Sequence, residues 1–167
     1  LVSLAFFLIY CILAALFESF SYPLIIIISI PFAISGVLIA LFIFNLSLNV
    51  SVYIGLVMLL GIVVNNAILL IENFISRVNE KNPLNVKQLE IMIKDSAIDR
   101  LRPILITTLT TILGLLPTAF DTGEGSQLWR PLAITVVSGL TASTFLTLIL
   151  VPLIFKNFYL LKNKSIH

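Results

Sequence analysis

The chain has 167 residues, of which 59% are hydrophobic and 11% are charged, and its mean hydropathy is +1.14. A soluble domain of this length carries far more charge, so the composition excludes that class and indicates an integral membrane protein surrounded by lipid. The formal net charge is only +2, which gives no reason to expect a nucleic-acid partner.

Five apolar stretches approach the length of about 20 residues that a helix needs to cross a bilayer. They lie at about 1–17, 23–44, 50–75, 103–120 and 131–159. We therefore expect an all-α membrane domain over 1–161 with five transmembrane helices, followed by a tail at 162–167. Because the chain begins without Met and inside an apolar stretch, we interpret it as a fragment that lacks an upstream part.

The basic residues predict the orientation in the membrane. Six of the ten Lys and Arg lie between the third and fourth spans, three lie at or after the end of the fifth, and Arg130 lies on the other side. Basic loops stay in the cytoplasm, so we expect the 72–102 linker and the C-terminus to be cytoplasmic.

Part of that linker has the pattern of a short amphipathic helix. After the turn signal Asn82-Pro83, the stretch 85–99 alternates an apolar arc with a charged one, broken by Ile91 and Ile98. We expect a separate helix on the cytoplasmic surface that opens at Asn85 as its N-cap.

Small residues are expected to mediate helix contacts, because lipid gives helices no hydrophobic reason to associate. The second span repeats small residues on one helical face at Ser29, Ala33, Gly36 and Ala40, and the fifth does so at Thr135, Ser138, Gly139, Ala142 and Ser143. The third and fourth spans contain Gly61 and Gly114. We expect Gly36, Gly61, Gly114 and Gly139 at helix contacts.

The third and fourth spans also carry polar faces. Asn65 and Asn66 lie together inside an apolar stretch, and the fourth span repeats hydroxyls at Thr107, Thr111 and Thr118. Amides at membrane depth are costly without partners, so they indicate either a polar pathway or hydrogen bonds to neighbouring helices and carbonyls. The centre of every span lacks Asp, Glu, Lys, Arg and His, so a proton-driven device would need further residues from elsewhere.

No residue pattern indicates catalysis, a cofactor or a metal. The single His is the terminal His167, Cys11 has no second cysteine, and the loop 121–126 offers too few ligands for calcium. We expect a protein that is not an enzyme.

Four blocks of sequence, in order, resemble the resistance-nodulation-division transporters of bacteria. They are AALFES at 14–19, GIVVNNAILLIE at 61–72, RLRPILITT at 100–108 with GLLP at 114–117, and WRPLA at 129–133. The resemblance covers nearly the whole chain. It implies that the five spans correspond to transmembrane helices 8–12 of that fold.

The resemblance implies an ion relay in the membrane. In the family, protons pass through two aspartates on the fourth helix, a lysine on the tenth and polar groups on the eleventh. The lysine position matches Asn65, with Asn66 beside it, while the threonine matches Thr107 and the entrance arginine matches Arg100. The aspartates would lie in the absent N-terminal half.

The resemblance further implies the remaining assembly. Relatives are inner-membrane homotrimers that work with a periplasmic adaptor and an outer-membrane channel, and they export small hydrophobic or amphiphilic compounds. Heavy-metal exporters of the family look different around 61–72, which favours the multidrug branch. Three alternatives remain open: a protein-translocation accessory of the same architecture, a lipid exporter, and a membrane scaffold without transport.

Overall fold

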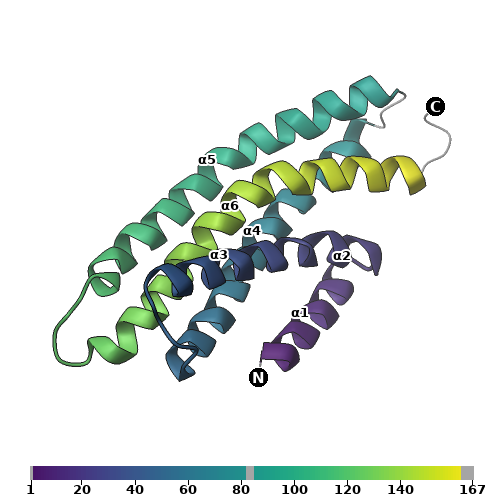
Figure 1. Ribbon diagram of the computed structural model, residues 1–167. Helices are drawn as coiled ribbons and strands as arrows, with labels where there is room; N and C mark the ends of the chain where they lie inside the picture. The colour runs from purple at the N-terminus through teal and green to yellow at the C-terminus, as the bar shows by residue number, and fades with distance from the viewer. Residues whose placement is uncertain (1, 82–84, 163–167) are drawn as a thin grey trace.

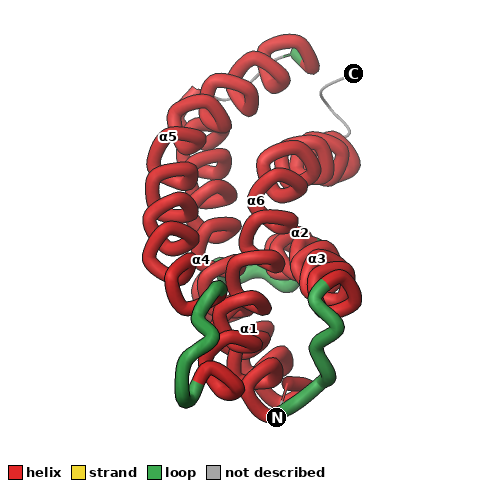
Figure 2. The backbone as a smooth tube through the Cα atoms, turned by 60° about the vertical axis from the view of Figure 1, so that its left-hand side comes forward, coloured by secondary structure: helices red, strands yellow, loops and turns green. Residues whose placement is uncertain are grey.

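The described part of the chain is a bundle of six helices. The computed structural model describes residues 2–81 and 85–162, and these two ranges contain no strand. In chain order the helices are α1 (Val2–Leu16), α2 (Ser21–Ile27), α3 (Ser29–Ile43), α4 (Val50–Lys81), α5 (Val86–Ala119) and α6 (Ser126–Lys162). Figure 1 shows α4, α5 and α6 running along the length of the molecule, and Figure 2 shows the loops that join the helices at its ends.

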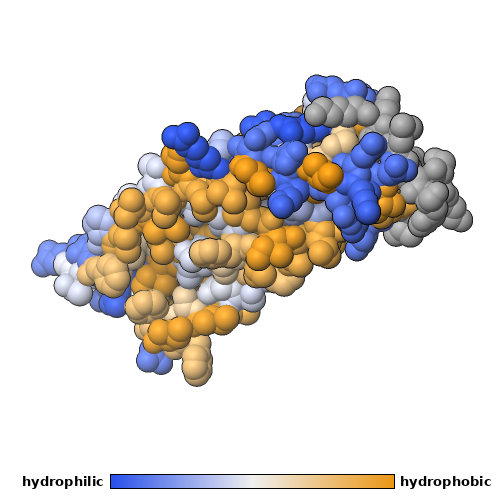
Figure 3. Space-filling model, turned by 90° about the horizontal axis from the view of Figure 1, so that it is seen from above, coloured by the Kyte–Doolittle hydropathy of each residue, from blue (hydrophilic) through white to orange (hydrophobic). Residues whose placement is uncertain are grey.

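Within residues 2–81 and 85–162, four segments are long and apolar enough to cross a membrane. They are Ser21–Ile43, which includes α2 and α3, Val50–Glu80, Val86–Ala119 and Ser126–Leu160, while α1 contributes a shorter apolar stretch, Phe7–Leu16. In Figure 3, apolar side chains cover the middle of the visible face, and hydrophilic ones gather toward the end where α5 begins. The prediction of an all-α membrane protein is confirmed.

The second span is interrupted at Ile28, between α2 and α3. Pro31 explains the break, because proline has no N–H to donate to the carbonyl of Ile27 and its ring crowds that carbonyl. The Ser29 hydroxyl donates to the carbonyl of Ile26 at 2.6 Å, which satisfies one more acceptor at the interruption.

The amphipathic segment 85–99 is helical as predicted, but it is not a separate surface helix. It continues through Pro103 into the fourth span and forms the 34-residue helix α5. Asn85 occupies the N-cap position with an extended backbone (φ −134°, ψ 152°), yet its side chain makes no capping hydrogen bond. The turn Asn82-Pro83 and the tail residues 163–167 lie outside the described residues.

Protein packing explains why α4 and α5 extend beyond the expected spans. Leu89 and Ile93, on the apolar arc of α5, are buried in the same core cluster as Phe74 and Val78 of α4 and Phe155 of α6. Their apolar faces therefore contact other helices, and the three helices stay packed beyond the stretch that lipid alone would require. The end of α4, the start of α5 and the end of α6 lie at the same end of the bundle (Figure 1).

Helix α6 is the central helix and contacts α3, α4 and α5 most extensively. Its approach to α3 is close, because a Cβ built on Gly36 would lie 2.4 Å from the Cβ of Ala142 and 3.0 Å from the Ser138 carbonyl. A Cβ on Gly139 would lie 2.2 Å from the side chain of Leu59 and 2.8 Å from that of Val37. The small faces of the second and fifth spans meet at this contact.

The other two glycines of the expected set lie elsewhere. Gly61 and Gly114 are exposed, and a Cβ on either would meet no atom within 4 Å in the described part of the chain. Gly55, which the small-residue pattern missed, is buried instead, and a Cβ there would lie 3.0 Å from the Cβ of Thr135 on α6. Gly55 is therefore a close-contact glycine between α4 and α6.

Candidate functional site

A pocket of about 490 Å³ opens between α4 and α5. Polar and apolar side chains line it: Met58, Gly61, Ile62, Asn65, Asn66, Leu69, Arg100, Pro103, Ile104 and Thr107. The four residues that the sequence predicted for an ion relay, two from each helix, are thus brought together in one place. Helical geometry explains the grouping, because residues four or seven apart share a face, as Gly61 and Asn65 do on α4 and Arg100 and Thr107 on α5.

The side chains of the two asparagines that line this pocket differ in exposure. Asn65 is exposed, whereas Asn66 is 8% exposed and reaches the pocket from deeper in the bundle. Neither side chain makes a hydrogen bond within the described residues. Since an amide offers two donors and an acceptor, both have unused capacity for a partner that enters the pocket.

Arg100 stands at one end of the pocket lining and Thr107 two turns further along α5. The Arg100 side chain is half-buried and forms no ion pair with any described residue. Arginine stays protonated at any physiological pH, so it gives this end of the pocket a fixed positive charge. A carboxylate is the natural partner for such a charge.

The Thr107 hydroxyl is bonded within its own helix. It donates toward the carbonyls of Pro103 and Ile104, at 3.2 and 3.0 Å. Thr110 and Thr111 donate in the same way to the carbonyls of Ile106 and Thr107, at 2.7 and 2.9 Å. A hydroxyl oxygen bonded in this way keeps its acceptor capacity, so Thr107 presents an acceptor to the pocket.

Thr108 takes part in a second polar contact, on the opposite side of α5. Its hydroxyl lies 3.2 Å from the hydroxyl of Thr144 on α6, and both residues are buried. This pair joins two packed helices and does not reach the pocket. Of these threonines, Thr107 lines the pocket, Thr108 contacts α6, and Thr107, Thr110 and Thr111 bond carbonyls of their own helix.

Sequence reasoning missed a further group of polar residues near the pocket. Asn73 and Arg77 of α4 contact Ser96 and Asp99 of α5, at the end where Arg100 lies. Each residue pair is more than 20 positions apart along the chain, so no local pattern could indicate it. The charges of 85–99 gave only the general signal of an exposed helical face.

Apolar helices of membrane-spanning length, with a largely apolar pocket that also carries two amides, an arginine and a threonine, indicate the general class of integral membrane proteins, and the comparisons make the class specific. The sequence profile of the AcrB/AcrD/AcrF family matches residues 1–159. The chain belongs to this family, which agrees with the resemblance to resistance-nodulation-division transporters.

Individual relatives include multidrug and heavy-metal pumps. The chain is 39% identical over 147 residues to the multidrug resistance protein MdtC of Edwardsiella ictaluri, covering 88% of this chain and 14% of the relative. It is 36% identical over 156 residues to MdtC of Yersinia pseudotuberculosis, covering 93% and 15%. The crystal structure of a heavy metal efflux pump (form II) is similar with a TM-score of 0.78 and 34% identity, covering 92% of this chain and 14% of that chain. The chain therefore spans about one seventh of the length of these proteins.

Proposed function

We propose that this chain is the C-terminal membrane part of a resistance-nodulation-division exporter and that its pocket takes part in ion coupling. The observation that carries the proposal is the grouping of Asn65, Asn66, Arg100 and Thr107 around one pocket, with the amides and the arginine lacking partners in the described residues. Such a protein is a secondary transporter and not an enzyme, because an ion gradient drives it and no bond of the cargo changes.

The pocket needs an acidic partner for this role. Arg100, Asn65 and Thr107 do not change protonation near neutral pH, so the proton must be carried by other groups. We propose that aspartates of the absent N-terminal half enter the pocket, where Arg100 would stabilise the carboxylate form and the amides and Thr107 would exchange hydrogen bonds with it. Asn65 acts here as a dipolar partner in place of the family lysine.

The cargo and the assembly belong to the same proposal. The MdtC relatives are multidrug resistance proteins, which supports hydrophobic or amphiphilic compounds as cargo. We propose a homotrimer in the inner membrane, with the C-terminus in the cytoplasm, that works with a periplasmic adaptor and an outer-membrane channel. The long apolar helices and the family support this arrangement.

Heavy-metal export is a second candidate, because the similar crystal structures are those of a heavy metal efflux pump. A growth assay with dyes and with metal salts separates the two cargos: protection against dyes alone supports the first candidate, and protection against metals alone supports the second.

The proposal is tested by dye accumulation in cells that lack their own pumps and express the full-length protein with its adaptor and channel. Wild type should lower accumulation, and Thr107→Ala should slow efflux about three- to tenfold, since it removes one hydrogen-bonding group. Thr110→Ala is the matched control, because Thr110 is an exposed threonine of the same helix outside the pocket lining.

The outcomes separate the alternatives. Equal efflux by wild type and Thr107→Ala at matched expression would remove Thr107 from coupling. Accumulation equal to that of empty cells would instead favour a lipid cargo, a protein-translocation role or a scaffold.

A further inference from the structure

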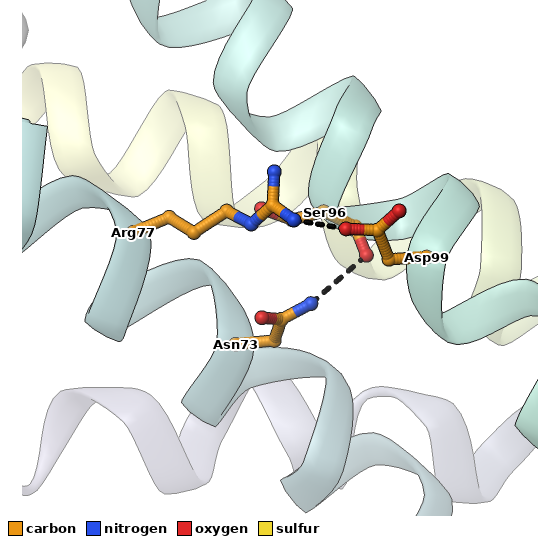
Figure 4. Close-up of polar contacts among 4 residues, drawn as sticks. All are labelled: Asn73, Arg77, Ser96 and Asp99. Atoms are coloured by element: carbon orange, nitrogen blue, oxygen red, sulfur yellow. Dashed lines mark hydrogen bonds and ion pairs between the residues drawn. The ribbon is translucent and has the colours of Figure 1, made fainter.

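Two polar contacts join α4 and α5 beside the pocket (Figure 4). The Asn73 amide Nδ2 donates to the main-chain carbonyl of Ser96 at 3.1 Å, and the Arg77 guanidinium forms an ion pair with the Asp99 carboxylate. Asn73 and Arg77 are one helical turn apart on α4, so they present their side chains to α5 from the same face. We call these four residues the α4–α5 clamp.

The clamp holds the turn of α5 that carries Arg100. In an α-helix the carbonyl of residue 96 accepts the N–H of residue 100, so Asn73 bonds the carbonyl that closes this turn. Asp99, the partner of Arg77, immediately precedes Arg100. Both contacts therefore act on the backbone segment from which the Arg100 side chain reaches the pocket.

Ser96 is buried at the contact between the Asn73 amide and α5. Ser96 is fully buried, and its hydroxyl has no hydrogen-bond partner in the described residues. The small side chain lets α4 approach the α5 backbone, while the hydroxyl itself contributes no bond. Ser96→Ala is therefore a control, because it removes the unbonded hydroxyl and keeps the main-chain carbonyl that Asn73 binds.

The clamp lies at one end of the pocket. Leu69 and Arg100 belong to the pocket lining, and Asn73 follows Leu69 by one turn. On the other side of α5, Glu90 pairs with Lys156 of α6. The first part of α5 is thus fixed to two helices, whereas a cavity of about 490 Å³ separates α4 from α5 directly beyond the clamp.

We propose that Asn73, Arg77 and Asp99 are positioning residues that fix the spacing of α4 and α5 at this end and hold Arg100 at the edge of the pocket. Their effect on export rests on the proposed function, but their effect on helix spacing does not. With the clamp broken, Arg100 loses its fixed position.

The test uses the full-length protein, with both transport and helix spacing measured. Arg77→Glu places a second carboxylate beside Asp99. We expect the maximal efflux rate to fall about two- to fivefold, the effect typical of losing a surface ion pair. The KM for dye should stay unchanged. Arg77→Glu combined with Asp99→Arg restores the opposite charges and should recover most of the rate. Asn73→Leu should lower the rate, whereas Ser96→Ala should not.

Lys94→Glu is the charge-reversal control, because Lys94 is an exposed cation of α5 that forms no ion pair with a described residue. It should transport like wild type. If Lys94→Glu slows export as much as Arg77→Glu does, the effect is one of general surface charge and the proposal is overturned.

Helix spacing at the clamp is measured by spin-label distances in purified protein in lipid nanodiscs, with labels at positions 79 and 95, which lie within four residues of the clamp residues of α4 and α5. These exposed positions lie outside the pocket lining. We expect Arg77→Glu to shift or broaden the distance distribution and the charge-swapped pair to restore it. An unchanged distribution in Arg77→Glu overturns the proposal. If wild type fails to export, the proposed function fails, and the distance measurement still decides the clamp.

Discussion

Asparagine at position 65 limits the chemistry that the pocket can perform. A lysine can lose its proton or change partners as a charge, whereas an amide can only donate and accept hydrogen bonds. The described lining contains one permanent cation, Arg100, and neither a carboxylate nor an imidazole. If the pocket couples to protons, the groups that bind them come from outside this lining, while Asn65 and Thr107 exchange hydrogen bonds with them.

Arg100 and Arg102 provide a residue-level comparison, since both are cations near the middle of α5. Arg100 lines the pocket and is half-buried, whereas Arg102 is exposed and lies outside the lining. We predict that Arg100→Ala lowers the efflux rate about tenfold, the size expected for losing a hydrogen bond to a charged group. Arg102→Ala should leave the rate close to that of wild type.

Dye efflux at matched membrane expression checks this comparison. A similar loss in both variants would mean that the two arginines act through insertion or topology, because each removes one basic charge near the same boundary. In that case Arg100 would have no separate role in the pocket.

At the scale of helices, the α3–α6 contact depends on two small residues. A Cβ on Gly36 would lie 2.4 Å from the Cβ of Ala142, which is too close for two carbon atoms. We therefore predict that Gly36→Ala lowers the free energy of unfolding by about 1–3 kcal/mol, the usual effect of overpacking a core. Ala142→Gly removes the opposing methyl, so the double variant should recover part of the loss. Thermal unfolding of the detergent-solubilised protein, followed by size-exclusion chromatography, measures both.

A double variant no more stable than Gly36→Ala would contradict this packing. The Ser138 carbonyl, 3.0 Å from the same built Cβ, explains why we expect recovery to be partial.

The sequence predicted several elements well and others poorly, for physical reasons. Hydropathy indicated apolar helices in the regions of α3, α4 and α6, and the small-residue period indicated the face on which Gly36 meets α6, because both patterns reflect local burial. The continuity of α5 was not predictable in the same way. Proline is more typical of a helix start than of a helix interior, so Pro103 favoured a span that begins there, whereas in the structure the helix continues through it.

The candidate site was predictable only in part. Helical spacing placed Asn65 and Thr107 on the faces that line the pocket. The alternative interpretation, in which hydroxyls bond carbonyls of their own helix, holds for Thr107 as well as for Thr110 and Thr111. The contact between Arg77 and Asp99 joins residues 22 positions apart, and such a pairing depends on how two helices pack. Gly61 fits the pattern of a packing residue, yet it borders a cavity.

At the scale of the whole molecule, the helices give a testable topology. The end of α4, the start of α5 and the end of α6 share one end of the bundle, and the loop after α5 lies at the other (Figure 1). We predict that a fluorescent protein fused to the C-terminus folds and fluoresces in the cytoplasm, while an alkaline phosphatase fusion there stays inactive. A cysteine at Thr122, in the loop between α5 and α6, should react with an impermeant maleimide from outside.

The opposite result, an active phosphatase fusion and an unreactive Thr122→Cys, would invert the orientation. It would place Arg100 and the clamp on the periplasmic side, and ions would then enter the pocket from the other end.

The central claim is that the pocket between α4 and α5 couples an ion gradient to export. The most direct measurement is dye transport by the purified full-length protein in proteoliposomes under an imposed pH gradient, comparing wild type, Thr107→Val and Thr107→Ser. Thr107→Val keeps the shape and removes the hydroxyl, whereas Thr107→Ser keeps the hydroxyl. We expect gradient-driven transport by wild type and Thr107→Ser, and a several-fold loss in Thr107→Val. Equal gradient-driven transport by all three proteins would contradict the central claim.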